Sequence, residues 1–341
     1  MSSNDVVGAV YVQTNEPENR VLVFRRREDG ALERLGTYPT GGAGSGVPHL
    51  PSQGSVALAG GGRTLLVTNA ASNDLSVFAV VTDGLELVQT VASGGATPRS
   101  VTEHNGLVYV LNTGDPSLAG FRLGGDGLKL IEGSRRELPG DADPAQAGFT
   151  PDGSMVVVTE RGADSIALYR VDADGLLSEP HVLPSSGPTP YGFGFARGGA
   201  LIVTEAFGAQ KGKAAVSSYR LGNEPAAVSR SVGNGRSEIC WAVVTKDGRY
   251  AFTTNFADGA VSRYAIAADG GLALDDSMAG TAVEGRTGLR DEDLSADGRF
   301  LYAIDADSRR IFGWGVGDGG QLSPVGSYEG LPPTVAGLAA S

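Results

Sequence analysis

The chain has 341 residues, a formal net charge of −12 at pH 7, 52 glycines and one cysteine. The acidic balance argues against a nucleic-acid partner, because no block of basic residues offsets it. The single Cys240 excludes an intrachain disulfide, and the opening segment has neither the pattern of a signal peptide nor that of a membrane span. We therefore expect a cytoplasmic monomer or small homo-oligomer with no membrane partner.

One pattern of apolar runs recurs along the chain. Each copy has a run that ends in Asn, Asp or Glu, followed by a second run with an aromatic residue at a fixed place. These aromatic residues are Phe24, Phe78, Phe121, Tyr169, Tyr219, Tyr264 and Trp314. Their spacing of about 50 residues is the size of a β-propeller blade.

Turn signals mark the same register. Asp-Gly pairs precede the first run, as in TPDGSM (150–155), or follow the second, as in GDGLKL (125–130). Glycine accepts the positive φ that tight hairpin turns require, so each unit is predicted to be four antiparallel strands. We name these strands A to D, from the central channel outward.

The predicted fold is an all-β, seven-bladed β-propeller in a single domain that spans residues 1–341. The first blade lacks a strand A, and the C-terminal segment PTVAGLAAS (333–341) supplies it, which closes the ring and protects the terminal edges. A count of six or eight blades would require a missed or doubled unit, and the Trp-Asp ending of WD40 blades is absent. The predicted blades are 9–42 with 333–341, 54–95, 97–140, 144–187, 189–235, 237–282 and 288–330.

Polar residues at the ends of the B strands are predicted to meet at one mouth of the channel. The D–A and B–C loops share that face, where irregular loops favour a pocket. Asn112 and Asn255 end two of these strands as possible substrate contacts, and Glu160 and Glu205 end the B strands of adjacent blades. Two carboxylates in one desolvated site can serve as general acid and general base. In the alternative interpretation, each glutamate binds neighbouring loop amides and holds the blades together.

Arginines accompany these carboxylates. Arg99 and Arg290 lie at the start of A strands, and Arg161 follows Glu160. Their guanidinium groups could clamp a substrate carboxylate or phosphate, or could form salt bridges between blades. The run 291–293 is one such salt-bridge partner.

Further candidates lie on the same face. His49, in the glycine-rich loop 40–54, is the only histidine placed to move protons there, although a surface role is the alternative. Gln53, Tyr191 and Trp241 are predicted to contact substrate, or to pack between blades. Hard oxygen ligands for a divalent cation are available, although no spacing signature supports a metal site; they are Asp291, Glu292, Asp293 and Asp305.

Four stretches resemble the bacterial β-propeller lactonase family, which includes 6-phosphogluconolactonase and a carboxymuconate lactonizing enzyme. They are SQGSVAL (52–58), CWAVVTKDGRYAFTTN (240–255), DLSADGRFLYAID (293–305) and GLPPTVAGLAA (330–340). The resemblance implies opening or closing of a lactone ring in a small carboxylated or phosphorylated acid, without a cofactor. It also implies that histidine, glutamate and arginine side chains act at the channel mouth. Where the family has Pro-His-x-His, this chain has Pro51-Ser52-Gln53-Gly54.

Three functions remain open from the sequence. The leading hypothesis is a lactonase-type hydrolase or lactonizing cyclase that uses general acid/base catalysis. The second is a non-catalytic propeller that binds a protein or small ligand, which would present a wide apolar face. The third is a biosynthetic cyclase or isomerase on the same scaffold.

Overall fold

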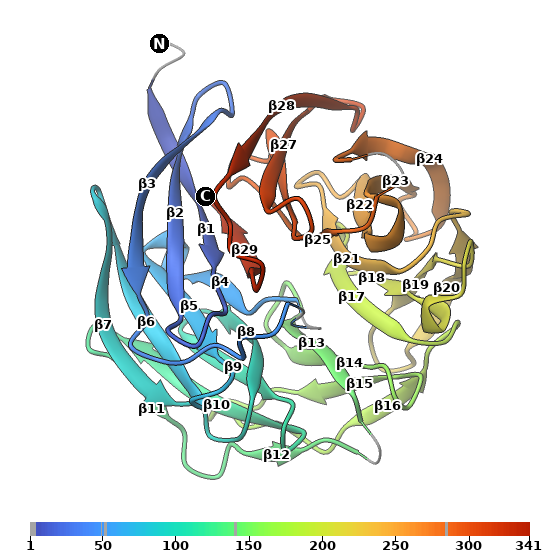
Figure 1. The fold of residues 1–341 in the computed structure, drawn as a ribbon. Helices are drawn as coiled ribbons and strands as arrows, with labels where there is room; N and C mark the ends of the chain where they lie inside the picture. The colour runs from blue at the N-terminus through green and yellow to red at the C-terminus, as the bar shows by residue number, and fades with distance from the viewer. Residues whose placement is uncertain (1–4, 49, 51–52, 140–141, 284–285) are drawn as a thin grey trace.

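The structure, a computed structural model, describes residues 5–48, 50, 53–139, 142–283 and 286–341. Its strands form seven antiparallel sheets arranged around a central channel (Figure 1). The predicted seven-bladed β-propeller is therefore confirmed. None of the helices in these residues is long and apolar enough to cross a membrane.

The inner half of each blade consists of strands A and B. The A strands are β4 (Val56–Ala59), β8 (Pro98–His104), β13 (Pro144–Phe149), β17 (Pro190–Phe195), β21 (Ile239–Val244), β25 (Leu289–Leu294) and β29 (Ala336–Ala340). The B strands are β5 (Thr64–Asn69), β9 (Leu107–Asn112), β14 (Met155–Glu160), β18 (Leu201–Glu205), β22 (Tyr250–Asn255), β26 (Phe300–Asp305) and β1 (Val6–Gln13).

The outer half consists of strands C and D. The C strands are β6 (Asp74–Val81), β10 (Ser117–Gly124), β15 (Ser165–Arg170), β19 (Ala215–Arg220), β23 (Ala260–Ile266), β27 (Arg310–Val316) and β2 (Arg20–Arg27). The D strands are β7 (Gly84–Ala92), β11 (Gly127–Leu130) with β12 (Arg136–Glu137), β16 (His181–Pro184), β20 (Ala226–Gly233), β24 (Leu272–Thr281), β28 (Leu322–Glu329) and β3 (Leu32–Pro39). Three short 3-10 helices are η1 (Gly60–Gly62), η2 (Phe207–Ala209) and η3 (Phe256–Asp258).

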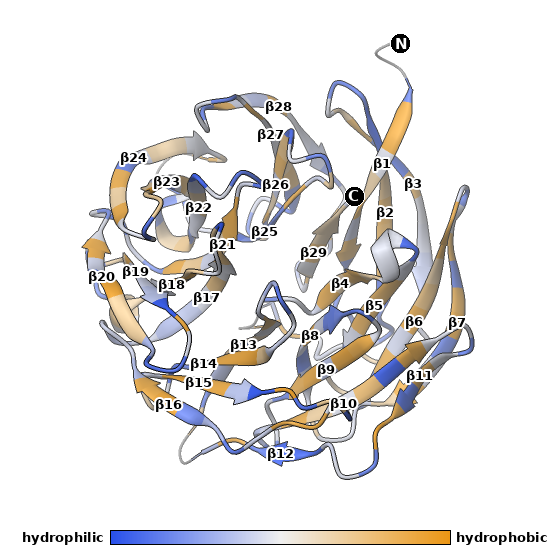
Figure 2. Cartoon of the chain, turned by 180° about the vertical axis from the view of Figure 1, so that it is seen from behind, coloured by the Kyte–Doolittle hydropathy of each residue, from blue (hydrophilic) through white to orange (hydrophobic). Residues whose placement is uncertain are grey.

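The hydrophobic core lies between neighbouring blades. In one cluster, Leu107 and Tyr109 of β9 pack against Val156 of β14 and Tyr169 of β15. Apolar strands and polar turns alternate around the wheel (Figure 2), and each blade buries its apolar faces only by stacking on its neighbours. The seven aromatic residues that marked the repeat are all buried on the C strands, each opposite an apolar residue of strand B.

The C-terminal strand closes the ring as predicted. Strand β29 pairs antiparallel with β1, with Val10 opposite Ala340 and Val12 opposite Leu338. Figure 1 shows this last strand lying beside the first blade. Because β29 supplies strand A of that blade, the two ends of the chain share one sheet and the inner edge of β1 is paired.

A buried arginine stabilises this closure. Arg26 of β2 is only 2% exposed, and its Nε donates to the carbonyl oxygen of Ser341 at 2.9 Å. Its Nη2 lies 3.2 Å from the carboxylate of Asp297 in the last blade, and its Cζ lies 5.5 Å from the centroid of the Phe300 ring. One side chain thus connects the first blade, the closing strand and the last blade.

We expect Arg26→Ala to lower the free energy of unfolding by about 3 kcal/mol, because it removes a buried side chain and leaves the carbonyl oxygen of Ser341 without its charged donor. Arg25→Ala is the matched control in the same strand, since its side chain is 36% exposed beside Asp83, and surface pairs contribute at most about 1 kcal/mol. Urea denaturation of both variants measures the difference. Equal losses would show that Arg26 does not stabilise the seam.

Candidate active site at the channel mouth

The ladder between strands A and B breaks at the same level in blade after blade. The register shifts just after the residue opposite the end of strand B in blades 3 to 7, and also where β29 meets β1. A bulge of this kind takes residues out of regular pairing and re-aims their side chains, and bulges are frequent beside active sites. The residues at this break are therefore free to face the channel mouth.

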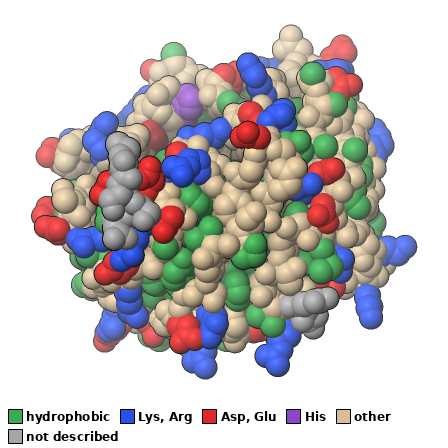
Figure 3. Space-filling model, turned by 90° about the horizontal axis from the view of Figure 1, so that it is seen from above, with side chains coloured by type: hydrophobic (Ala, Val, Ile, Leu, Met, Phe, Trp, Pro, Cys, Tyr) green, Lys and Arg blue, Asp and Glu red, His purple; other side chains and the backbone are tan. Residues whose placement is uncertain are grey.

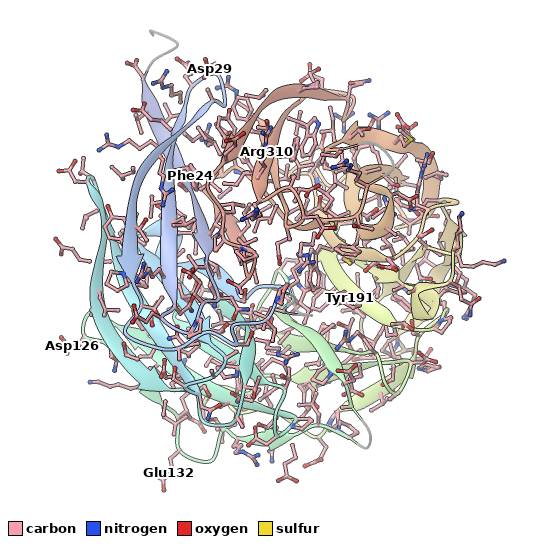
Figure 4. All side chains as sticks on the ribbon, in the orientation of Figure 1. Phe24, Asp29, Asp126, Glu132, Tyr191 and Arg310 are labelled. Atoms are coloured by element: carbon pink, nitrogen blue, oxygen red, sulfur yellow. The ribbon has the colours of Figure 1, made fainter. Side chains whose placement is uncertain are left out.

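The break contains several of the predicted site residues. It holds Arg99 in β8, and the pairs Tyr191-Gly192 in β17, Cys240-Trp241 in β21 and Arg290-Asp291 in β25. Figure 4 shows Tyr191 beside the central channel, far from the rim residues Asp126 and Glu132. Residues nearly 200 positions apart in the chain thus become neighbours around one axis.

A pocket of about 400 Å³ opens at this level and bridges blades 4 to 7. Its charged lining residues are Arg161 after β14, Arg290 of β25 and Glu238 before β21. The remaining lining is largely apolar and comprises Thr189, Tyr191, Ala206, Gly208, Ala209, Ile239, Cys240 and Phe256. We call this the mouth pocket.

Both arginines of the mouth pocket are held against aromatic rings. The Cζ of Arg161 lies 4.9 Å from the centroid of the Tyr191 ring, and that of Arg290 lies 5.0 Å from the centroid of the Phe256 ring. Arg161 also forms a 2.6 Å ion pair with Asp143, and Arg290 donates to the carbonyl of Pro48 at 2.7 Å. These contacts fix both guanidinium groups in position before any ligand arrives.

The positive charge of the mouth includes a third arginine. Burial, and then the nearby charge of Arg161, lower the pKa of Arg99. The charges of Asp143 and Tyr191 raise the pKa of Arg99 and so oppose that shift. The three arginines and Tyr191 therefore form one electrostatic cluster. The structure therefore brings four of the predicted substrate contacts together, namely Arg99, Arg161, Arg290 and Tyr191.

Two protonated groups line the same pocket. Burial raises the pKa of the Cys240 thiol to about 12, and burial also raises the pKa of Tyr191 far above neutrality. Both side chains carry their protons at pH 7, so neither can accept one. Cys240 is a small buried residue of the pocket wall, and its Sγ lies 3.5 Å from the carbonyl oxygen of Glu238.

Glu160 and Glu205 do not line the mouth pocket. Glu205 accepts hydrogen bonds from Ser217 at 2.6 Å, from Ser231 at 2.7 Å and from the backbone N–H of Gly187 at 2.8 Å. These contacts join strands B, C and D to the D–A loop of blade 5, which agrees with the structural interpretation of this residue. The predicted catalytic role of both glutamates stays a prediction.

Glu160 is less well satisfied than Glu205. Its Oε2 accepts a 2.8 Å hydrogen bond from Ser165, whereas its buried Oε1 has no hydrogen-bond partner in the described part of the chain. Burial raises its pKa, and the Ser165 hydrogen bond partly offsets that rise.

The two asparagines at strand-B ends, like Glu205, form hydrogen bonds to neighbouring strands and loops. Asn112 donates to the carbonyl of Ser93 at 3.4 Å, and Asn255 bonds to Asn234 at 2.9 Å and to Ser262 at 2.9 Å. Both are fully buried and lie outside the mouth pocket. Their predicted contact with substrate stays a prediction.

Trp241 packs behind the pocket. Its ring centroid lies 4.8 Å from that of Tyr191, so it supports the pocket wall. The indole is completely buried, and its Nε1 has no acceptor among the described residues.

Gln53 binds the free inner edge of another blade. Its Nε2 donates to the carbonyl of Ala242 at 3.2 Å and its Oε1 accepts from the N–H of the same residue at 3.3 Å. Gln146 does the same to Phe193, at 3.2 Å and 2.7 Å. Side chains thus replace the missing ladder partner of two A strands. His49, the remaining predicted catalytic residue, lies outside the described residues.

The acidic run 291–293 lines a second cavity of about 420 Å³, deeper along the channel. Its members have different partners: Asp293 accepts from the N–H groups of Leu294 and Ala340 at 2.8 and 2.9 Å, while the carboxyl of Glu292 interacts with the backbone of Thr254. Asp305 accepts from the N–H of Ser308 at 2.7 Å. Within the part of the chain that the structure describes, no three His, Cys, Asp or Glu side chains converge to hold a metal ion.

Some residues of the site were missed from the sequence. Asp143, which positions Arg161, and Phe256, which supports Arg290, were not singled out, and Gln146 was not recognised as an edge cap. The position of the break along strand A is the signal that could have identified Gln146, because Gln146 and Asp291 occupy equivalent places in the A strands of their blades.

The comparisons with known proteins agree with this architecture. The model of the family described as "Lactonase, 7-bladed beta-propeller" matches residues 7–131, 126–206 and 206–335. No curated protein matches in a sequence search.

Solved structures show the same fold at low identity. The periplasmic gluconolactonase PpgL of Pseudomonas aeruginosa is 18% identical, with 98% of this chain and 99% of that chain covered and a TM-score of 0.73. A candidate 6-phosphogluconolactonase of Bacteroides fragilis is 19% identical, with 99% of both chains covered and a TM-score of 0.73. A Lactobacillus plantarum protein is 16% identical, with 97% and 99% covered and a TM-score of 0.74.

We expect Glu205→Ala to lower the free energy of unfolding by about 3 kcal/mol, because it leaves three hydroxyls and one backbone N–H without their buried acceptor. Glu160→Ala is the matched control at the equivalent position, where only Ser165 loses its partner. Thermal and urea unfolding of the two variants gives the comparison. A larger loss for Glu160→Ala would contradict this account of Glu205.

The half-buried carboxyl of Asp293 makes stability depend on pH. Burial raises its pKa to about 7, although the hydrogen bonds from Ala340 and Leu294 oppose the rise. A carboxyl with a raised folded-state pKa stabilises the fold most at low pH, and this contribution is lost as pH rises through that pKa. We expect the melting temperature of Asp293→Asn, relative to wild type, to increase between pH 5 and pH 8. A difference that stays constant or falls would refute the assignment.

Proposed function

The chain belongs to the family of seven-bladed β-propeller lactonases, and from this premise we propose that it opens or closes the ring of a small carboxylated lactone in the mouth pocket. The observation that carries the proposal is the pair of prepositioned arginines, Arg161 and Arg290, in one pocket of about 400 Å³. A cavity of that volume suits a small molecule.

The arginine pair suits the charges of lactone chemistry. One guanidinium can bind a substrate carboxylate through two parallel hydrogen bonds. The other can stabilise the oxyanion that develops when the lactone carbonyl is attacked, and the Nε of Arg290 is buried without an acceptor among the residues that the structure describes. The low exposure of the site strengthens both interactions.

The apolar lining of the mouth pocket favours a substrate with few hydroxyl groups. Ala206, Ile239 and Phe256 offer no side-chain partners for sugar hydroxyls, and the polar side-chain groups besides the arginines are those of Thr189, Glu238, Cys240 and Tyr191. A buried hydroxyl without a hydrogen bond costs roughly 1–3 kcal/mol. The pocket therefore supports a carboxylated lactone with few hydroxyl groups over a polyhydroxylated sugar lactone.

The surface offers no competing nucleic-acid site on the face seen in Figure 3, where acidic and basic side chains are interspersed. A net charge of −12 leaves the arginine cluster as a local positive region in an acidic protein. Such a region attracts small anions into the mouth pocket.

We expect wild-type protein to release acid from a carboxylated muconolactone-type substrate faster than from an aldonolactone, as followed in a pH-stat. Arg161→Gln and Arg290→Gln should each lower kcat/KM about 100-fold, because each removes a charged donor. Arg249→Gln is the control, since Arg249 is 57% exposed beside an Asp-Gly turn on the far face. The reverse reaction is assayed with the open hydroxy acid.

The outcomes separate the alternatives. Wild-type turnover that survives both arginine substitutions would exclude the mouth pocket as the active site. Binding of the lactone acid, measured by calorimetry, without turnover in either direction would favour a non-catalytic binding propeller. A reaction that proceeds only toward ring closure would identify a lactonizing cyclase.

A further inference from the structure

Asp291 occupies a special position beside the mouth pocket. It follows Arg290 directly, and the register of β25 against β26 shifts between Leu289 and Glu292, so Asp291 lies inside the break. Arg290 lines the mouth pocket, while Asp291 lines the channel cavity just beyond it. The equivalent positions in blades 5 and 6 hold Gly192 and Trp241, which cannot titrate near neutral pH.

The carboxyl of Asp291 is buried but only partly satisfied. The residue is 3% exposed, and its Oδ2 has no hydrogen-bond partner among the described residues. The backbone N–H of Gly337 in β29 interacts with the carboxyl. A buried carboxylate oxygen without a donor is costly, and such groups are retained mainly where function uses them.

Charged and titratable groups reach Asp291 from three strands. Arg290 and Glu292 come from its own strand, Tyr191 from β17 and Cys240 from β21. Asp293, further along β25, lines the same cavity. The negative charge of Asp291 in turn raises the pKa values of Tyr191 and Cys240. These effects place the carboxyl in the same electrostatic cluster as the mouth pocket.

Three other groups at the mouth are poorly suited to accept a proton. Tyr191 and Cys240 hold theirs at neutral pH because burial raises their pKa values. The carboxylate of Asp143 is engaged by Arg161 at 2.6 Å. Glu238 is the remaining carboxyl of the pocket lining, and it serves below as a comparison.

We propose that Asp291, which lies where the channel cavity adjoins Arg290 of the mouth pocket, is the general base toward a lactone bound in that pocket, an assignment that rests on the proposed lactone chemistry. In hydrolysis, the Asp291 carboxylate takes a proton from water while the water oxygen bonds to the lactone carbonyl carbon. The ring C–O bond then breaks, and the proton passes to the departing alkoxide, which leaves a hydroxy acid and regenerates the carboxylate. Arg290, next to Asp291, binds the oxyanion formed between these two steps.

The ionisation of Asp291 supports this role. Burial raises its pKa to about 6, and the charge of Arg290 limits the rise. The group is therefore mostly ionised at pH 7.5 and is a stronger base than an exposed aspartate. The rate should rise with pH and level off above an inflection near pH 6.

The test is the pH profile of kcat/KM for wild type and Asp291→Asn on the carboxylated lactone. We expect Asp291→Asn to lose about 100-fold in kcat/KM at pH 7.5, the lower end of what a general base contributes, and to lose the inflection near pH 6. Calorimetry of the substrate acid should show binding within a few fold of wild type, because both arginines remain. The melting temperature shows that the variant is folded.

Matched variants distinguish Asp291 from the other carboxyl groups that could act as the base. Asp293→Asn changes a carboxyl of the same strand outside the break and should keep both rate and inflection. If Glu238→Gln, Glu160→Gln or Glu205→Gln removes the inflection while Asp291→Asn retains it, the assignment to Asp291 is overturned. Inactivity of wild type in both directions overturns the lactone chemistry as well, whereas an active wild type with an unchanged Asp291→Asn profile overturns Asp291 alone.

Discussion

Six of the A strands leave the regular ladder at one level, just where each faces the end of strand B. Without this break, alternate residues of an A strand would point into the seams between blades, as the neighbouring apolar residues do. The break takes one or two residues per blade out of that alternation. Arg99, Tyr191, Cys240 and Arg290 all come from it, so the chemistry of the mouth follows from a backbone feature that the fold repeats.

A propeller with open inner edges needs something else to satisfy them. Here side chains do so: Gln53 binds both backbone groups of Ala242 across 189 residues of sequence, and Gln146 binds those of Phe193. The side-chain amides of Gln53 and Gln146 connect neighbouring parts of the ring inside the channel, as Arg26 does where the first and last blades meet. The rigid frame that results can hold the mouth arginines in place against their mutual repulsion.

The sequence predicted the fold well, because strand period, Asp-Gly turns and aromatic spacing are local signals that repeat. It predicted the site only in part. Arg161, Arg290 and Tyr191 meet as expected, since strand order alone brings them to one face. The side-chain direction at strand-B ends was not predictable. Glu205 points toward the hydroxyls of Ser217 and Ser231, and these donors lie 12 and 26 residues away in the sequence.

The family motif with two histidines is replaced here by Ser52-Gln53-Gly54, and Gln53 serves a structural purpose. The proposed lactone chemistry, without those histidines, requires another proton acceptor, and the break in β25 provides a carboxyl directly beside an arginine. Its position on a strand fixes it more firmly than a loop would. The same burial that makes an unpaired oxygen of Asp291 costly also brings its pKa to about 6. A destabilising feature of the fold is thus the property that would make the residue useful at neutral pH.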